Sequence, residues 1–143
     1  MNAAPAAASP SVASRFVDNG DGTITDTSTG LMWSKATLSQ ACVTHAQAEG
    51  ICADLDLAGH KDWRLPTVEE LFPLADRSRH NPAIDTEAFP DTHSDWYWTS
   101  TIAAWSSDGA WYVSFNYGYS DGDLRRDYDG AFVRAVRAVP SGQ

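Results

Sequence analysis

The sequence has few cysteines, few basic residues and no long apolar run. Only two of its 143 residues are cysteines, too few for the disulfide scaffold of a small secreted domain. No apolar stretch approaches the roughly 18 residues of a membrane-spanning helix, so we expect no direct membrane insertion. Ten Lys and Arg against nineteen Asp and Glu give a formal net charge of −9. This charge repels phosphate backbones, anionic lipid and sulfated sugars, so we expect no binding to nucleic acid.

The redox state of the two cysteines, Cys42 and Cys52, is open at this stage. On a continuous helix they would lie about 15 Å apart, which is too far for a disulfide. A turn between them, for which Gly50 offers a place, would bring them closer. The sequence is therefore compatible with either state.

Residues 1–14 differ in composition from the rest of the chain. They are rich in Ala, Pro and Ser and have neither the basic start nor the apolar centre of a signal peptide. This composition predicts a disordered leader or linker, compatible with a longer, exported parent protein. Residues 15–140 have the length of one compact domain.

Turn signals divide the first part of this domain into strands. Residues 15–33 alternate β-branched and aromatic residues with the pairs Asn-Gly, Asp-Gly and Thr-Gly, which predicts strands joined by tight turns. The DNGDG segment invites comparison with an EF-hand loop. That spacing would put Gly20, Gly22 and Thr29 at positions that need ligand oxygens, so the turn interpretation is favoured.

Two capping boxes predict two helices. Thr37 with Gln40 predicts a helix that begins there and either ends near Gly50 or resumes briefly to Leu55. Thr67 with Glu70 predicts a second helix. Because Pro73 lies beyond the first turn, the second helix should kink or stop early.

The later part of the chain is aromatic and rich in β-formers. The period of two in residues 111–116 predicts a strand with one inward and one outward row. The inward row is Trp111, Val113 and Phe115, and the outward row is Tyr112, Ser114 and Asn116. A last strand is predicted over 132–139, with Arg134 and Arg137 on opposite faces.

Six blocks of the sequence resemble the C-terminal domain family of the Legionella collagen-like adhesin, which occurs widely in bacterial and phage proteins. They are DNGDGTITDTSTGLMW (18–33), LAGHKDWRLPTVEEL (57–71), PAID (82–85), YWTST (97–101), AWYVSF (110–115) and VRAVR (133–137). The most specific is DWRLPT followed by YWTST. The blocks span nearly the whole chain after residue 15.

The resemblance implies an α+β domain of the C-type-lectin-like fold, with two helices, small antiparallel sheets and long loops. It also implies that Trp63 packs in the core and that Arg64 pairs internally. Trp33, Trp98 and Trp111 are likewise expected in the core. The chain departs from the family pattern at Pro73, and at Ala135, where a Cys often stands and could pair with Cys52.

No arrangement of residues supports an enzyme. The segment from Gly118 to Gly122 matches the G-x-S-x-G motif, but the motif needs a strand-to-helix turn and a histidine later in the chain. The last histidine, His93, precedes Ser120. The reactive cysteine pair of formylglycine-generating enzymes, which share the broad fold, is also missing after Cys52. We therefore expect no catalytic residues.

No cofactor is expected either. The four histidines lack metal-ligand spacing: His45, His60, His80 and His93. Calcium is an alternative for the later aspartates, although a solvated acidic loop is the more common outcome: Asp121, Asp123, Asp127 and Asp129. The calcium-dependent sugar motifs of true C-type lectins do not occur in the sequence, and fold resemblance alone does not carry sugar binding.

The stretch from Trp96 to Val133 is the candidate recognition surface. It combines Tyr with Ser, Asp, Asn and Gly, the composition of antibody binding sites, although ordinary polar loops also favour Gly, Asp and Ser. Residues 99–132 contain no Lys, Glu, Gln or Met, whereas an even spread of the chain's eleven such residues would place two or three there.

This bias fits the variable proteins of diversity-generating retroelements, a role that the resemblance implies because members of the family serve it. Mutagenesis of template adenines turns an Asn codon into codons that end in a pyrimidine, so Lys, Glu, Gln, Met and Trp cannot arise. Trp105 and Trp111 would then be fixed scaffold. The predicted ligand-binding, diversified positions are Tyr112, Ser114, Asn116, Tyr117, Tyr119, Ser120, Asp121, Asp123, Arg125, Arg126, Asp127, Tyr128 and Asp129.

The expected function is a binding domain for a protein or other macromolecule on a cell or particle surface. It would act at a bacterial surface, as a secreted protein or on a phage particle. One alternative is an adhesin of fixed specificity, whose family ligand would be sulfated glycosaminoglycan. The acidic charge opposes that ligand except near Arg125 and Arg126. The other alternative is a structural accessory domain of a phage or envelope assembly.

Overall fold

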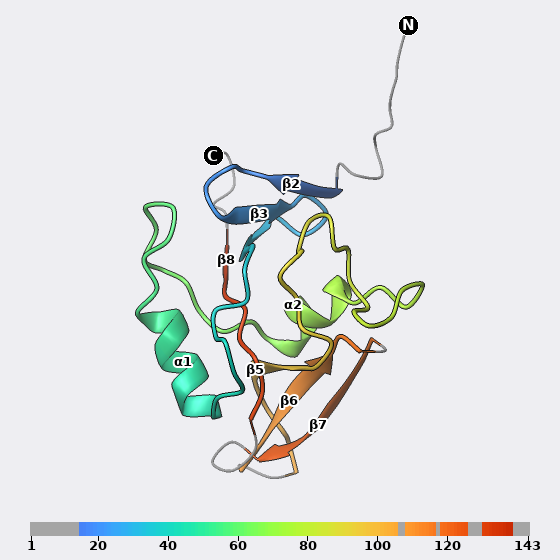
Figure 1. The fold of residues 1–143 in the computed structure, drawn as a ribbon. Helices are drawn as coiled ribbons and strands as arrows, with labels where there is room; N and C mark the ends of the chain where they lie inside the picture. The colour runs from blue at the N-terminus through green and yellow to red at the C-terminus, as the bar shows by residue number, and fades with distance from the viewer. Residues whose placement is uncertain (1–14, 106–107, 117, 126–129, 139–143) are drawn as a thin grey trace, which may run out of the picture.

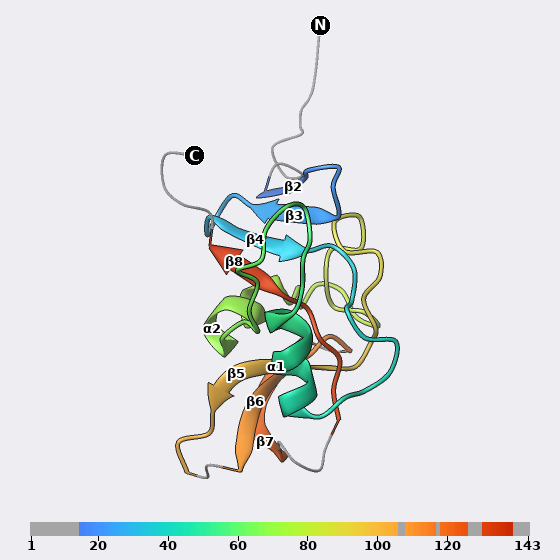
Figure 2. The same ribbon diagram turned by 90° about the vertical axis from the view of Figure 1, so that its left-hand side faces the viewer.

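The computed structural model describes residues 15–105, 108–116, 118–125 and 130–138, with backbone alone for 123–125. This part of the chain has two short α-helices and two antiparallel sheets, which confirms the predicted α+β class. The sheets lie at opposite ends of the molecule with the helices between them (Figures 1 and 2). No helix in the described ranges is long and apolar enough to cross a membrane.

The first sheet brings the two ends of the domain together. Its strand order is β2-β3-β4-β8, so the last strand pairs with β4. The predicted tight turn between β2 and β3 is confirmed, because Gly20 and Gly22 have φ of +78° and +91°, a region that glycine adopts without strain. The strands are β2 (Phe16–Asp18), β3 (Thr23–Asp26), β4 (Leu31–Ser34) and β8 (Val136–Ala138).

Helix α1 (His45–Ala53) begins later than predicted. Its N-cap is Thr44, whose hydroxyl accepts from the Gln47 amide while the Gln47 side chain accepts from the Thr44 amide. The prediction of a cap at Thr37 was wrong. Its hydroxyl instead hydrogen-bonds with the Tyr97 hydroxyl at 2.6 Å, so a tertiary contact outweighs the local capping pattern.

Helix α2 (Val68–Leu71) confirms the second capping box. The Thr67 hydroxyl accepts from the Glu70 amide, and the Glu70 carboxylate accepts from the Thr67 amide. The helix tightens at once into a 3-10 turn, η2 (Phe72–Leu74). This early end agrees with the effect predicted for the proline at position 73.

The second sheet has the order β5-β6-β7 and carries the candidate recognition stretch. It contains β5 (Trp96–Ile102), β6 (Gly109–Ser114) and β7 (Tyr119–Arg125). The register shifts within both strand pairs, between Trp98 and Ile102 on β5 and between Ala110 and Tyr112 on β6. Such irregularities bend a sheet and re-aim its side chains.

Two cores flank the second sheet, and they confirm the expected burial of Trp33, Trp63 and Trp98. The first core includes Ile24, Trp33, Leu71, Ile84, Phe89, Tyr97, Val113, Phe115 and Val136. The second includes Ala48, Cys52, Trp63, Leu65, Trp98, Ala110, Tyr112, Val133 and Ala135. The predicted last strand is shorter than expected: β8 covers only Val136–Ala138, and the residues before it make isolated bridges to other segments.

Candidate functional site

One side of the second sheet carries a group of residues that we call the aromatic face: Trp96, Tyr112, Ser114, Tyr119 and Asp121. Ser114 on β6 lies opposite Trp96 on β5 and Tyr119 on β7, and Tyr112 lies opposite Asp121. Residues that pair directly across antiparallel strands project to the same side. The register therefore brings these five side chains together from three strands.

The three rings of the aromatic face contact one another. The centroids of Trp96 and Tyr112 lie 5.2 Å apart, and those of Tyr112 and Tyr119 lie 6.1 Å apart. Tyr112 is only 6% exposed, whereas Trp96 and Tyr119 are 37% and 41% exposed. The buried central ring thus supports two outer rings that remain open to solvent.

Helix α1 covers only one end of this side of the sheet. Trp98, two residues from Trp96 on the same side, is fully buried. The ring of His45, the first residue of α1, packs against it at 5.1 Å, and the Trp98 Nε1 donates to the Val43 carbonyl at 2.7 Å. The end of the sheet at Trp96 lies beyond these contacts, which leaves its aromatic surface accessible.

The predicted outward row on β6 needs correction. Tyr112 and Ser114 were expected to face solvent, but they are 6% and 1% exposed. The period of two is right, because Val113 and Phe115 face the first core while Tyr112 belongs to the second. The expectation failed because β6, the central strand, is buried on both of its sides, and alternation cannot distinguish a second core from solvent. Trp111, expected inward, is only partly buried.

The other predicted site residues divide into three groups. Tyr119 and Asp121 are exposed on the aromatic face, Ser120 projects to the opposite side beside Val113, and Asn116 is partly exposed just after β6. Asp123 and Arg125 lie on β7, of which the backbone alone is described there. The rest lie outside the described residues: Tyr117, Arg126, Asp127, Tyr128 and Asp129.

The described residues offer little to a metal ion or to a serine nucleophile. They contain no group of three or more His, Cys, Asp or Glu side chains that could hold a metal, although Asp127 and Asp129 are not among them. Ser120 lies inside strand β7 and pairs with Val113. This is not the strand-to-helix turn on which a G-x-S-x-G nucleophile stands.

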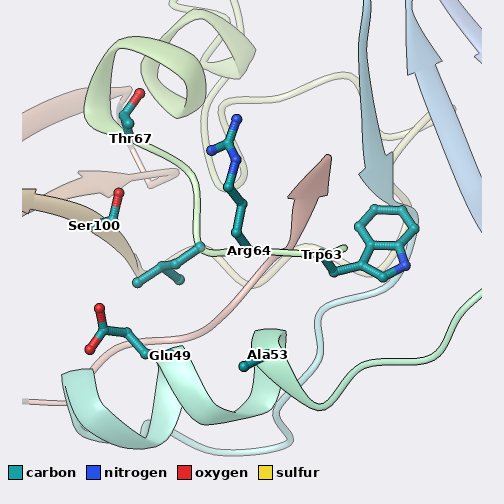
Figure 3. A pocket seen from close by; sticks show the side chains of 7 residues that line it. Glu49, Ala53, Trp63, Arg64, Thr67 and Ser100 are labelled. Atoms are coloured by element: carbon teal, nitrogen blue, oxygen red, sulfur yellow. The ribbon is translucent and has the colours of Figure 1, made fainter. Parts of the chain in front are cut away.

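A cavity of about 360 Å³ lies between α1, β5 and the segment before α2 (Figure 3). Its charged wall is already used internally, because Arg64 donates to both carboxylate oxygens of Glu70 at 2.7 Å. Figure 3 shows Arg64 extending toward the first turn of α2, away from Glu49 on α1. The Trp63 Nε1 donates to the Leu57 carbonyl at 3.3 Å. These bonds confirm the structural roles expected for Trp63 and Arg64.

From the sequence, Trp96 was predicted only as the boundary of the recognition stretch. Periodicity places Trp96 and Trp98 on the same side of a strand, so it cannot tell an exposed tryptophan from a buried one. The difference comes from α1, whose position beside Trp98 is a tertiary feature. No local signal in the sequence would have identified Trp96 as a site residue.

The comparison with protein families identifies one family. Residues 22–137 match the Lcl C-terminal domain family. The chain therefore belongs to that family, which associates it with adhesins. A search of curated proteins finds no match.

Proposed function

We propose that this chain is a ligand-binding domain rather than an enzyme, and that the aromatic face makes the main contact. The observation that carries the proposal is the exposure of Trp96 and Tyr119 on either side of the buried Tyr112. The ligand class is a protein or other macromolecule on a cell or particle surface. The domain would act at a bacterial surface, as a secreted protein or on a phage particle.

Preorganisation of the three aromatic rings supports this proposal. Trp and Tyr present large contact areas and lose little side-chain entropy on binding, and interface energy concentrates on such residues. Here Tyr112 already holds the two outer rings in place, which lowers the ordering cost further. The second sheet also lies at the end of the molecule opposite β2 and β8 (Figure 1), so the aromatic face is distant from the ends of the domain.

The fold supports the same proposal. Terminal strands that share one sheet, two helices between the sheets and a second sheet at the far end fit a C-type-lectin-like domain, whose second sheet and loops carry ligand contacts. We propose that fold on the arrangement of these elements together with the family membership.

A finer proposal is that the domain is the variable protein of a diversity-generating retroelement. The bias of residues 99–132 against Lys, Glu, Gln and Met supports it. Among the described positions, Asn116, Tyr119, Ser120 and Asp121 are open enough to vary without loss of the core. Tyr112 and Ser114 are buried, so we expect them to tolerate few residue types.

The binding role can be tested with a library of random peptides displayed on phage. Selection on the wild-type domain should enrich peptides that Trp96→Ala and Tyr119→Ala weaken and that Val17→Ala does not. Val17 is a matched control, since it is 43% exposed on the other sheet. Peptides whose binding survives both aromatic substitutions would overturn the proposal. Loss of folding in both variants would support a structural accessory role instead.

The diversification proposal has its own test in the coding sequence and its surroundings. We expect a near-identical, adenine-richer repeat and a reverse transcriptase gene beside it. Related copies sequenced from one population should differ at Tyr119 and Asp121 while Trp105 and Trp111 stay constant. Substitutions spread evenly over the domain would contradict it.

The family membership favours one further candidate, an adhesin of fixed specificity. The ligands of such an adhesin would be sulfated sugars, which the net charge of −9 repels. This domain could therefore bind them only through a local basic patch. We expect the domain to pass through a heparin column at low salt. Retention that a modest salt increase abolishes would favour the adhesin.

A further inference from the structure

Five residue pairs in the chain are of the types that rearrange most readily without an enzyme. An asparagine or aspartate followed by glycine can close a five-membered succinimide ring, because glycine has no side chain to shield its amide nitrogen. From sequence alone the Asn-Gly pair should react first, since a neutral amide is attacked more readily than a carboxylate. The pairs are Asn19-Gly20, Asp21-Gly22, Asp108-Gly109, Asp121-Gly122 and Asp129-Gly130.

Hydrogen bonds in the turn between β2 and β3 protect the Asn-Gly pair. The Asn19 Nδ2 donates to the hydroxyls of Thr23 and Thr25, each at 2.9 Å. The Gly20 amide, which would have to attack the Asn19 side chain, donates instead to Asp18 Oδ1 at 2.9 Å. Because other partners hold both reacting groups, this pair should react slowly in the folded domain.

The Asp21 carboxylate is also held away from the amide that follows it. Its Oδ1 accepts from the backbone amide of Thr23 at 3.2 Å and from the Thr23 hydroxyl. These bonds turn the carboxyl group toward Thr23 rather than toward the Gly22 nitrogen. Of the remaining pairs, Asp108 already takes part in another interaction, and Asp129 lies outside the described residues.

The Asp121-Gly122 pair on β7 has the opposite arrangement. The Gly122 nitrogen lies 2.7 Å from Oδ1 of Asp121, the side chain that directly precedes it. Because this oxygen is bonded to Cγ, the nitrogen already lies beside the carboxyl carbon that it would attack. Asp121 is exposed, so water reaches the carboxyl group. The two groups that must react are therefore brought together by the folded state itself.

The pairing of β6 with β7 is irregular at this point. Tyr112 pairs with Asp121, but the next pair is Ala110 with Leu124, so one residue of β6 lies opposite two of β7. Such a bulge interrupts the ladder of backbone hydrogen bonds and leaves the extra residue unpaired. The sheet therefore constrains the Gly122 peptide unit less than a regular ladder would, which permits the rotation that ring closure needs.

We propose that Asp121-Gly122 is a site of spontaneous aspartate isomerisation in the folded domain. The Gly122 nitrogen attacks Cγ of the protonated Asp121 carboxyl group. The new N–Cγ bond replaces one Cγ–O bond, and the released oxygen leaves as water with the carboxyl proton and the amide proton. Water then opens the succinimide. Attack at Cγ restores aspartate, whereas attack at the Asp121 main-chain carbonyl carbon gives isoaspartate, in which the chain runs through Cβ and Cγ.

This rearrangement would change the sheet that carries the candidate site. Isoaspartate adds one methylene carbon to the β7 backbone, which disturbs the pairing of Asp121 with Tyr112. It also moves Gly122, against which the rings of Trp105 and Trp111 pack: a Cβ atom there would lie 2.8 Å from Trp105 Cη2 and 2.9 Å from Trp111 Cε2. The modification would thus limit the lifetime of this sheet, whichever ligand the domain binds.

The test is an incubation of the purified domain at physiological temperature in water enriched in the heavy oxygen isotope. Each succinimide that opens takes up one heavy oxygen, which mass spectrometry detects. Chymotrypsin cleavage after Tyr119 and Leu124 isolates the Asp121-Gly122 pair in a short peptide. Electron-transfer fragmentation then distinguishes isoaspartate from aspartate.

The folded and unfolded chains should give different orders of reaction. In the folded domain we expect isoaspartate to accumulate several-fold faster at Asp121 than at Asp21, while Asn19 stays largely an amide. In guanidinium chloride Asn19 should react fastest and the two aspartates at similar rates, because unfolding removes both the protection and the preorganisation. Isoaspartate that forms no faster at Asp121 than at Asp21 in the folded domain would overturn the proposal. The same order of rates in both states would overturn it as well.

Asp121→Glu is the matched variant, since it keeps the charge but cannot close a five-membered ring. During the same incubation the near-ultraviolet circular dichroism spectrum of the wild type should drift, as the packing of Trp105 and Trp111 changes, while that of Asp121→Glu stays constant. This readout needs no ligand, so it is independent of the proposed function. An equal drift in both proteins would contradict the effect proposed for the sheet.

Discussion

At the scale of single residues, Arg134 does most to join distant segments. It is 1% exposed, and its guanidinium donates to the carbonyls of Ser34 and Lys35 at 2.7 and 2.6 Å and to the Thr92 hydroxyl at 2.8 Å. It also lies 4.8 Å from the centre of the Phe89 ring. Burial lowers the pKa of Arg134, and these contacts offset the cost of a buried charge. From the sequence, Arg134 was predicted to lie on one face of a strand, and this role was not predicted.

Arg134→Lys should therefore be strongly destabilising although it keeps the charge. A lysine ammonium cannot replace the planar fork that reaches three acceptors at once. We expect a loss of about 3 kcal/mol or more in the free energy of unfolding, measured by urea denaturation. Arg79→Lys is the control, because the Arg79 side chain is 43% exposed and pairs with Asp76 at the surface, and it should change stability by less than about 0.5 kcal/mol. Equal losses would show that Arg134 is not a structural link.

At the scale of elements, a local sequence pattern predicted the structure correctly where no tertiary contact competed with it. The capping box at Thr67 formed as predicted and the one at Thr37 did not, because Thr37 bonds to Tyr97 from a strand sixty residues away in the sequence. Alternation correctly placed Tyr112 and Val113 on opposite sides of β6. The alternation did not reveal that both sides of β6 are buried, because the residues that bury them come from elements distant in the sequence. The predicted site residues therefore stay a prediction, in which Trp96 was not included and Tyr112 was wrongly expected to face solvent.

The cap of α2 should give the domain a measurable acid sensitivity. Hydrogen bonds from Arg64, opposed by partial burial, hold the pKa of Glu70 below its ordinary value of 4.5. A carboxylate with a lowered pKa stabilises the fold above its unfolded pKa, and this contribution is lost as the pH falls through the folded pKa. Glu70→Gln should cost about 1 kcal/mol at neutral pH, and the difference from wild type should shrink below about pH 4.5.

Chemical denaturation across a pH series measures this difference. Glu69→Gln is the matched control, since Glu69 is an exposed neighbour on the same helix, and its effect should stay within about 0.5 kcal/mol. A Glu70→Gln deficit that persists undiminished at low pH would contradict the assignment.

Helix α1 makes the two cysteines chemically distinct. Both are free thiols, Cys42 exposed and Cys52 fully buried, and burial with nearby Glu49 raises the pKa of Cys52 to about 12. Because the thiolate is the reactive form, a thiol reagent at mildly alkaline pH should modify only Cys42 in the folded protein and both residues in urea. A Cys42→Ser variant should be inert until it unfolds. Rapid labelling of both thiols in the native state would contradict the buried position of Cys52 on α1.

At the scale of the whole molecule, one sheet ties the ends of the domain together and the other presents side chains at the far end (Figures 1 and 2). The acidic charge, visible in the composition, acts on every part of this surface and favours cationic partners over sulfated ones. Sequence blocks were enough to place the chain in the Lcl C-terminal domain family. The division of the second sheet into covered and open regions depends on three-dimensional packing and was not predicted.

The aromatic face is central to the proposed binding role, and one affinity comparison tests that role directly. The strongest peptide selected on the wild-type domain should bind at least about tenfold more weakly to Trp96→Ala and to Tyr119→Ala, with melting temperatures close to wild type and with unchanged affinity for Val17→Ala. Wild-type affinity in both aromatic variants would contradict the claim that this face is the binding surface.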